Sequence, residues 1–202
     1  MQERTLCISE NVTVRGQPEP VGRRLDNRKL GMWIFLASEV MLFSSLIGAF
    51  LQAKARSPAT ANEVLNIPVA AINTFVLIVS STAVVMALSS IEDGNKTGLR
   101  NFLILTLLLG ATFLSIQIIE FAHLLREGFT PSGSLFAGAF YTVTGFHGFH
   151  VFIGLLILLW LIPQAIKGRL TSAEHMRVEV FGLYWHFVDV VWIVLFTIIY
   201  LL

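Results

Sequence analysis

The chain has 202 residues, of which 55% are apolar and only 13% charged, and its mean hydropathy is +0.74. Soluble domains carry roughly 25% charged residues, so this composition excludes an ordinary soluble globular domain. A net charge of +1 gives none of the basic excess expected for nucleic-acid binding, and a single cysteine, Cys7, excludes an internal disulfide.

Residues 1–30 are polar, basic and without the apolar core of a cleavable signal peptide, and we expect them to form a cytoplasmic N-terminal tail. The rest of the chain contains apolar runs of roughly 20 residues or more, the length at which a helix crosses the hydrocarbon core of a bilayer. Five such spans are predicted, at about 31–53, 67–90, 100–122, 136–162 and 180–202. The connections are too short for a folded domain. The pattern predicts an all-α integral membrane protein, a five-helix bundle over 31–202.

The distribution of basic residues predicts the orientation of this bundle, because short loops rich in Lys and Arg stay in the cytoplasm. Eleven of the 14 lysines and arginines lie in the tail and in the second and fourth connections. The opposite side has only Lys54, Arg56 and Arg126. The N-terminus is therefore predicted to be cytoplasmic and the C-terminus outside.

Ionisable side chains inside the spans are the strongest functional signal, since charged groups are costly in hydrocarbon unless they are paired or neutralised. All of them are carboxylic acids or imidazoles: Glu39, Glu120, His147, His150, His186 and Asp189. Three pairs are spaced i, i+3, which places both members on one helix face: Glu120/His123, His147/His150 and His186/Asp189.

Three interpretations of these residues are open from spacing alone. Glu-x-x-His on a helix is a ligand pattern of di-iron bundles, which favours a membrane metalloenzyme, although here the pattern occurs only once. The rise per residue places Glu39 and His147 at nearly the same depth, which makes them candidate partners across the bundle. The simplest interpretation is that the groups hold helices together through interhelical hydrogen bonds.

Two local strings resemble subunit III of the haem–copper respiratory oxidases, and of the cytochrome c oxidase type most closely. The first is Thr144-Gly-Phe-His-Gly-Phe-His-Val151 followed by Gly154, and the second is Tyr184-Trp-His-Phe-Val-Asp-Val-Val-Trp192. The resemblance covers about residue 30 to the C-terminus. It identifies a set of packing residues: Asn73, Thr74, Gln117, Thr144, Gly145, Gly148, Gly154, Trp185 and Trp192.

The resemblance implies the five-helix bacterial form of subunit III, in the bacterial inner membrane. Such a subunit has no catalytic centre, cofactor or metal of its own, because haem and copper belong to the partner subunits. It packs beside subunit I, which reduces dioxygen to water and pumps protons, in a complex with subunit II and small subunits. It retains phospholipids, supports proton uptake and protects the catalytic centre. Glu39 matches a buried glutamate of the family, with a structural or modulatory role.

The alternatives differ in what the intramembrane residues do. Closely similar subunits serve quinol oxidases, so the electron donor to the complex is cytochrome c or quinol, and the string from Thr144 to Val151 favours cytochrome c. A stand-alone metalloenzyme would use Glu39, Glu120 and the histidines as ligands. A proton-coupled carrier would use Glu39 as a relay, but the sequence has no internal repeat.

Overall fold

The computed structural model describes residues 27–56, 67–171 and 174–202. These residues form five long helices and no strand: α1 (Asn27–Arg56), α3 (Ile67–Glu92), α4 (Lys96–Arg126), α5 (Leu135–Ile166) and α6 (His175–Phe196). A turn of π-helix, η2 (Thr197–Leu201), continues α6. Each long helix has the length and apolar character to cross a membrane. The predicted five-span, all-α architecture is confirmed.

The helices extend beyond the predicted spans because an apolar run reports only the part of a helix that lies in hydrocarbon. The largest difference at one end is the early start of α6 at His175, and α1 also begins before its predicted span, at Asn27. Residues 27–30, predicted to belong to the tail, are therefore helical. The remainder of the predicted tail, residues 1–26, lies outside the described residues.

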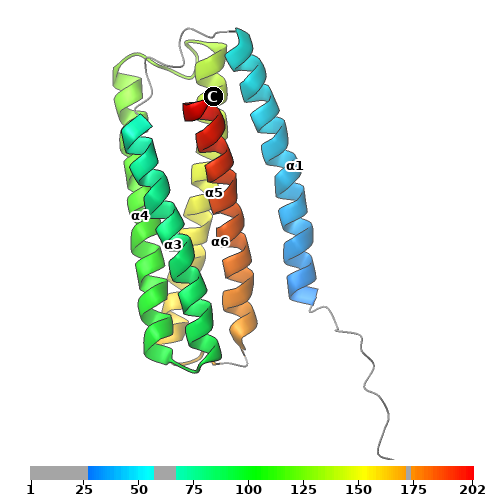
Figure 1. Ribbon diagram of the computed structural model, residues 1–202, viewed down its shortest axis with the longest axis vertical. Coiled ribbons are helices and arrows are strands. Elements are labelled where there is room, and N and C mark those ends of the chain that lie inside the picture. The colour runs from blue at the N-terminus through cyan, green and yellow to red at the C-terminus, as the bar shows by residue number, and fades with distance from the viewer. Residues whose placement is uncertain (1–26, 57–66, 172–173) are drawn as a thin grey trace, which may run out of the picture.

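A tight turn joins α3 and α4 and makes them antiparallel neighbours. Gly94 has a φ of +72°, a left-handed conformation that glycine adopts without steric cost. The side chain of Asn95 then caps α4 by accepting a hydrogen bond of 2.9 Å from the backbone N–H of Gly98. This turn aligns the two helices, which pack side by side (Figure 1).

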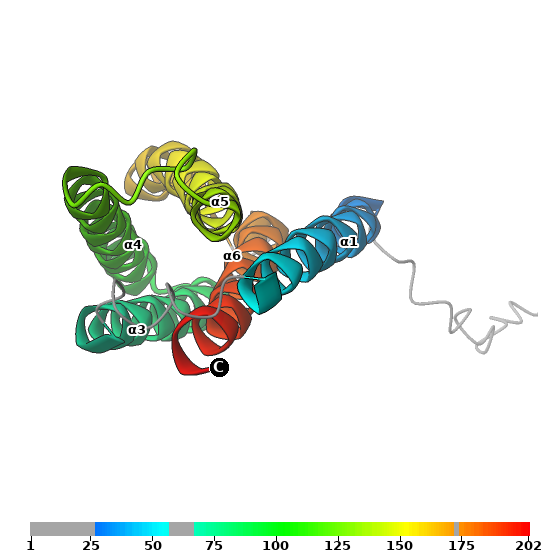
Figure 2. The same ribbon diagram turned by 90° about the horizontal axis from the view of Figure 1, so that it is seen from above.

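Helices α3, α4, α5 and α6 pack in a ring, in which α3 contacts α4 and α6, and α5 contacts α4 and α6. Figure 2 shows this ring from above, with α1 lying outside it against α5 and α6. The chain enters α1 at one end of the bundle and leaves η2 at the other (Figure 1). We call the first of these the basic end, because Lys29, Lys96 and Lys167 lie there.

One narrow stripe of side chains attaches α1 to the ring. Leu36, Phe43 and Phe50 are buried at intervals of seven residues, and the half-buried Glu39 and Leu46 lie between them. This is the a/d spacing of coiled coils, in which a helix contacts its neighbours along a single seam. Ala53 continues this seam, most of the other side chains of α1 are exposed, and α1 is therefore an arm on one side of the bundle.

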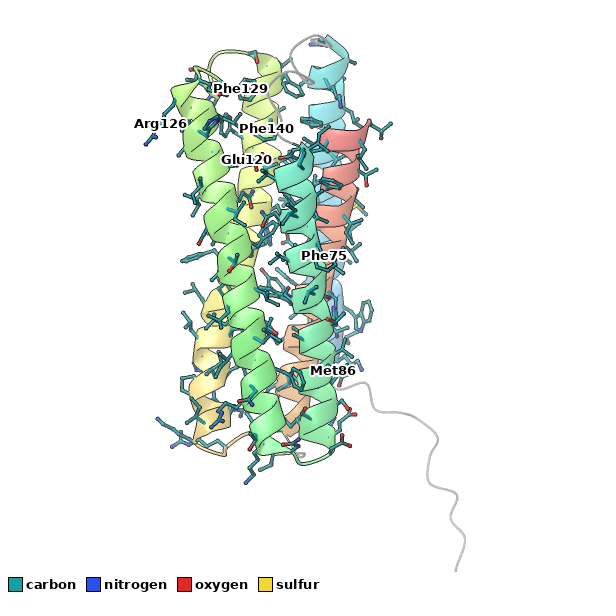
Figure 3. All side chains as sticks on the ribbon, turned by 60° about the vertical axis from the view of Figure 1, so that its left-hand side comes forward. Phe75, Met86, Glu120, Arg126, Phe129 and Phe140 are labelled. Atoms are coloured by element: carbon teal, nitrogen blue, oxygen red, sulfur yellow. The ribbon has the colours of Figure 1, made fainter. Side chains whose placement is uncertain are left out.

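The outer surface of the ring is apolar, as its core is. Phe75 and Met86 of α3 project outwards from the bundle (Figure 3) and are 67% and 53% exposed. Soluble proteins rarely expose apolar surface on this scale. The faces are suited to contact with lipid or with other membrane-spanning helices.

Candidate functional site

A carboxyl–imidazole pair joins α1 to α5 inside the membrane-spanning part of the bundle. Nε2 of His150 lies 3.0 Å from Oε2 of Glu39, and both side chains are largely buried. Nδ1 of His150 lies 2.7 Å from the carbonyl oxygen of Phe146, so Nδ1 carries a proton and donates it to that carbonyl. A single proton therefore lies between Nε2 and the Glu39 carboxyl. The aromatic edge of Phe43 packs on the His150 ring at a centroid distance of 5.1 Å.

The candidate pairing of Glu39 with His147, one of the three interpretations left open by the sequence, is wrong. His147 is fully buried on another side of α5, where its Nε2 lies 3.3 Å from the carbonyl oxygen of Val188 on α6. Its ring packs against Trp192 at 4.8 Å and Phe113 at 5.8 Å. Depth was a poor guide here because it says nothing of helix rotation. Side chains three residues apart on a helix point in directions that differ by about 60°, which is enough to face a different neighbour.

Two further polar contacts hold α1, one at each end of the helix. At the basic end Lys29 forms an ion pair with Glu179 of α6. At the other end Nζ of Lys54 donates to the carbonyl oxygen of Ile198 at 3.2 Å. With the Glu39–His150 pair between them, these contacts attach α1 at three levels. No pattern in the sequence had indicated the two terminal contacts, since Lys at a span end is usually solvated.

Two tryptophans of α6 bind hydroxyl groups of α3, and Asp189 lies between them. Nε1 of Trp185 donates to Oγ of Ser80 at 3.0 Å, and Nε1 of Trp192 donates to Oγ1 of Thr74 at 2.9 Å. Asp189 is 4% exposed, and neither carboxyl oxygen is in hydrogen-bonding geometry with a donor among the described residues. The α3–α6 interface is thus a polar seam within a hydrophobic bundle.

Trp185 is also held between two glycines of neighbouring helices. A Cβ atom at Gly154 of α5 would lie 2.5 Å from Cζ3 of the Trp185 ring, and one at Gly110 of α4 would lie 2.8 Å from Cη2. Both distances are well inside van der Waals contact. The indole, which is fully buried, therefore occupies space that only glycine leaves open on α4 and α5.

Two amide side chains join α4 to its neighbours. Nε2 of Gln117 donates to the carbonyl oxygen of Thr144 on α5 at 3.0 Å, and Nδ2 of Asn73 on α3 donates to the carbonyl oxygen of Phe113 at 3.2 Å. The Thr144 hydroxyl bonds to its own helix, at the carbonyl of Phe140. These bonds hold the close approach of α3, α4 and α5 in the bundle centre.

The other two glycines of the string that begins at Thr144, Gly148 and Gly145, differ in their surroundings. A Cβ at Gly148 would lie 3.5 Å from Oε1 of Gln117, which is ordinary contact. A Cβ at Gly145 would meet no atom within 4 Å. Within this chain, only Gly154 of the three is required by a close approach.

Glu120 and His123 lie at the end of the bundle opposite the basic end. Oε1 of Glu120 accepts a hydrogen bond of 3.3 Å from Tyr200 of η2, whereas the exposed His123 faces Glu127 at 3.5 Å. Figure 3 shows Glu120 at this end of α4, near the Phe129–Phe140 contact between the α4–α5 connection and α5. Tyr200 was missed as a partner, because nothing in its apolar run marks it.

None of the three i, i+3 pairs acts as a pair. Glu120 and His123 have different partners, as do His147 and His150, and Nδ1 of His186 lies 2.5 Å from Oγ of Ser81 on α3. In residues 27–56, 67–171 and 174–202, no three His, Cys, Asp or Glu side chains come together in a group that could hold a metal ion. The ligand set that a metalloenzyme would need is therefore not assembled in this part of the chain.

Replacing Trp192 by phenylalanine is expected to lower the stability of the bundle by about 1 kcal/mol, because it removes the donor to Thr74 while keeping an aromatic ring. The midpoint of thermal unfolding should fall by roughly 2–4 °C, measured by size-exclusion chromatography after heating in detergent. The matched control is Trp160→Phe, since Trp160 is 59% exposed. Equal midpoints for both variants would show that the Trp192 bond contributes nothing.

Comparison with known proteins agrees with the helix arrangement and the motifs. A family model described as "Cytochrome c oxidase subunit III" matches residues 7–202. The chain is 36% identical over 178 residues to "Cytochrome bo(3) ubiquinol oxidase subunit 3" of Pseudomonas aeruginosa, covering 87% of this chain and 85% of the relative. It is 38% identical to "Quinol oxidase subunit 3" of Bacillus subtilis over 175 residues, which are 86% of each chain.

A second protein of Bacillus subtilis, "Cytochrome c oxidase subunit 3", is 38% identical over 194 residues, covering 94% of this chain and 93% of the relative. Relatives named for either electron donor thus match at the same identity. With five apolar helices and a family match that reaches the C-terminus, the chain belongs to the cytochrome c oxidase subunit III family, the third subunits of haem–copper oxidases.

Proposed function

We propose that this chain is the non-redox subunit III of a cytochrome c oxidase that reduces dioxygen to water and pumps protons. It packs beside subunit I in the bacterial inner membrane, with its basic end in the cytoplasm. Haem and copper are held by the partner subunits. The chain contributes by retaining phospholipid, by supporting proton uptake into subunit I and by stabilising the catalytic centre during turnover.

The observation that carries this proposal is the use of the polar side chains inside the bundle. Glu39, Gln117, Trp185 and Trp192 each bond to a neighbouring helix. Residues committed to helix contacts are suited to a rigid accessory subunit rather than to chemistry of their own. The apolar outer faces are suited to lipid and to helices of partner subunits.

The test is purification of the tagged chain from its native membrane in mild detergent, with the haem spectrum, copper content and co-purifying subunits recorded. We expect haem and copper to accompany a large partner and to stay with that partner when a harsher detergent removes this chain. During turnover, the complex without this chain should lose activity faster than the complex that retains it. Metal that stays on the isolated chain would contradict the proposal and favour a metalloenzyme.

The electron donor is tested separately, because relatives of both kinds match equally. The string from Thr144 to Val151 favours cytochrome c. We expect the purified complex to oxidise reduced cytochrome c and to oxidise quinol at no more than a background rate. Faster oxidation of quinol than of cytochrome c would assign the chain to a quinol oxidase. It would not contradict the proposed accessory role of the chain.

A further inference from the structure

Three polar side chains inside the helix ring each have one buried atom without a hydrogen-bond partner among the described residues. The atoms are Oδ1 of Asn73 on α3, Oε1 of Gln117 on α4 and Nδ1 of His147 on α5. The three residues are 2%, 4% and 0% exposed. A buried polar atom without a partner is costly, and native proteins pair nearly all of them with protein groups or with ordered water.

The bond made by the other polar atom of each side chain identifies the unpartnered atom as an acceptor. The amide nitrogens of Asn73 and Gln117 donate to backbone carbonyls of neighbouring helices, at 3.2 Å and 3.0 Å. Nε2 of His147 lies 3.3 Å from the carbonyl oxygen of Val188, so Nε2 carries the proton of the neutral imidazole. The three unpartnered atoms therefore present lone pairs, and each needs a donor.

The same bonds place the three acceptors at one level of the bundle. Asn73 is bonded to Phe113, which lies one helical turn before Gln117 on α4. Gln117 is bonded to Thr144, which lies three residues before His147 on α5. The rings of Phe113 and His147 also pack edge to face at a centroid distance of 5.8 Å. The acceptors thus form one polar layer across α3, α4 and α5.

The neighbouring side-chain donors are already committed to other groups. The hydroxyls of Thr74 and Thr144 each donate to a carbonyl of their own helix, and Nε1 of Trp192 donates to Thr74. Each of these groups has a single proton. The carboxyl of Asp189 is bonded to none of the three acceptors. The donors for this layer must therefore come from a molecule other than these side chains.

We infer that the polar layer binds water inside the ring, with water protons donated to Asn73 Oδ1, Gln117 Oε1 and His147 Nδ1. Water is small and donates two hydrogen bonds, and the acceptors are neutral amide and imidazole groups that would not offset the charge of a cation. Gly148 of α5 places no side-chain atom beside the Gln117 amide, whose atoms would be the nearest to a Cβ there, at 3.5–3.6 Å. The bound water joins three helices.

The test is hydroxyl-radical footprinting of the wild-type protein purified with its partners from the native membrane. A brief X-ray pulse converts water into hydroxyl radicals, which oxidise the side chains next to each bound water. The comparison is between Phe113 and Phe50, which are 0% and 1% exposed, because Phe50 packs against Phe136 rather than against the polar layer. Mass spectrometry should find oxidation at Phe113 and none at Phe50. Absence of oxidation at Phe113, or equal oxidation of both, would overturn the inference.

A variant connects the water to its acceptors. Gln117→Met keeps an unbranched side chain and removes the amide, so oxidation of Phe113 should fall towards the level of Phe50. The matched control is Gln52→Met, the same substitution at an exposed position of α1, which should leave oxidation of Phe113 unchanged. Wild-type oxidation of Phe113 in Gln117→Met would contradict binding of water at this layer.

A density map of the wild-type protein, at a resolution that shows ordered water, gives a test that needs no variant to assemble. Water oxygens are expected about 2.7–3.2 Å from the unpartnered atoms of Asn73, Gln117 and His147. An ion or a side chain at those atoms, or no density beside any of them, would overturn the inference. Each of these outcomes is independent of which subunits and which haem co-purify, and those results test the proposed function.

Discussion

Leucine in place of Gly154 is expected to prevent the chain from forming its bundle and from entering a complex. A Cβ at this position would already lie 2.5 Å from the Trp185 ring, and the ring has little room to retreat towards α4, because a Cβ at Gly110 would likewise lie 2.8 Å from it. Nε1 of Trp185 is also bonded to Ser80. A larger side chain must therefore separate α5 from α6 rather than push aside a mobile group.

Alanine tests the same contact more finely, since it adds only the Cβ. Gly154→Ala is expected to destabilise the bundle by about 1–3 kcal/mol, the usual cost of forcing an extra carbon into a packed core. The measurement is the midpoint of thermal unfolding in detergent. Gly145→Ala is the matched control, because it lies in the same helix with no atom within 4 Å of the added Cβ, and it should be at least as stable as the wild type.

A double variant separates this steric mechanism from a general effect on the helix. Trp185→Phe removes part of the indole, so Gly154→Ala should cost less in that background than in the wild type. Equal costs in both backgrounds would show that the ring is not what Gly154 accommodates. Alanine would then act through helix propensity alone, which at a helical glycine is stabilising.

The sequence could predict the five helices because each contains a long apolar run. The length of such a run is set by the thickness of the bilayer and not by contacts with other helices. It could also identify Gly154 and Trp185 by resemblance, but not that they touch each other, since they lie on different helices. The Glu39–His147 pairing failed for a related reason. The pairing used depth alone, whereas the rotation of α5 directs His150 towards α1 and His147 towards α6.

Leucine in place of Glu39 is expected to loosen α1 from the ring. It would leave Nε2 of the buried His150 without its partner, at a cost of about 1–3 kcal/mol for an unsatisfied buried group. The consequence should be large because α1 packs on the ring along a narrow seam and this pair lies near its middle. Spin labels at the exposed Met41 of α1 and Leu159 of α5, in a Cys7→Ser background, should give a narrow distance distribution in the parent chain and a broad one in Glu39→Leu.

Glutamine at the same position should behave like the parent chain, and this contrast identifies what the pair provides. Because Nδ1–H of His150 is committed to the Phe146 carbonyl, a neutral imidazole presents the lone pair of Nε2 to residue 39. The side-chain amide introduced by Glu39→Gln would donate to that lone pair, so a hydrogen bond persists without a carboxyl. If Glu39→Gln instead broadens the distance distribution while Glu39→Asp keeps it narrow, the contact requires a carboxyl group. The two variants therefore separate a helix tether from a group whose acidity matters, and only the second would return Glu39 to consideration as a proton-handling residue.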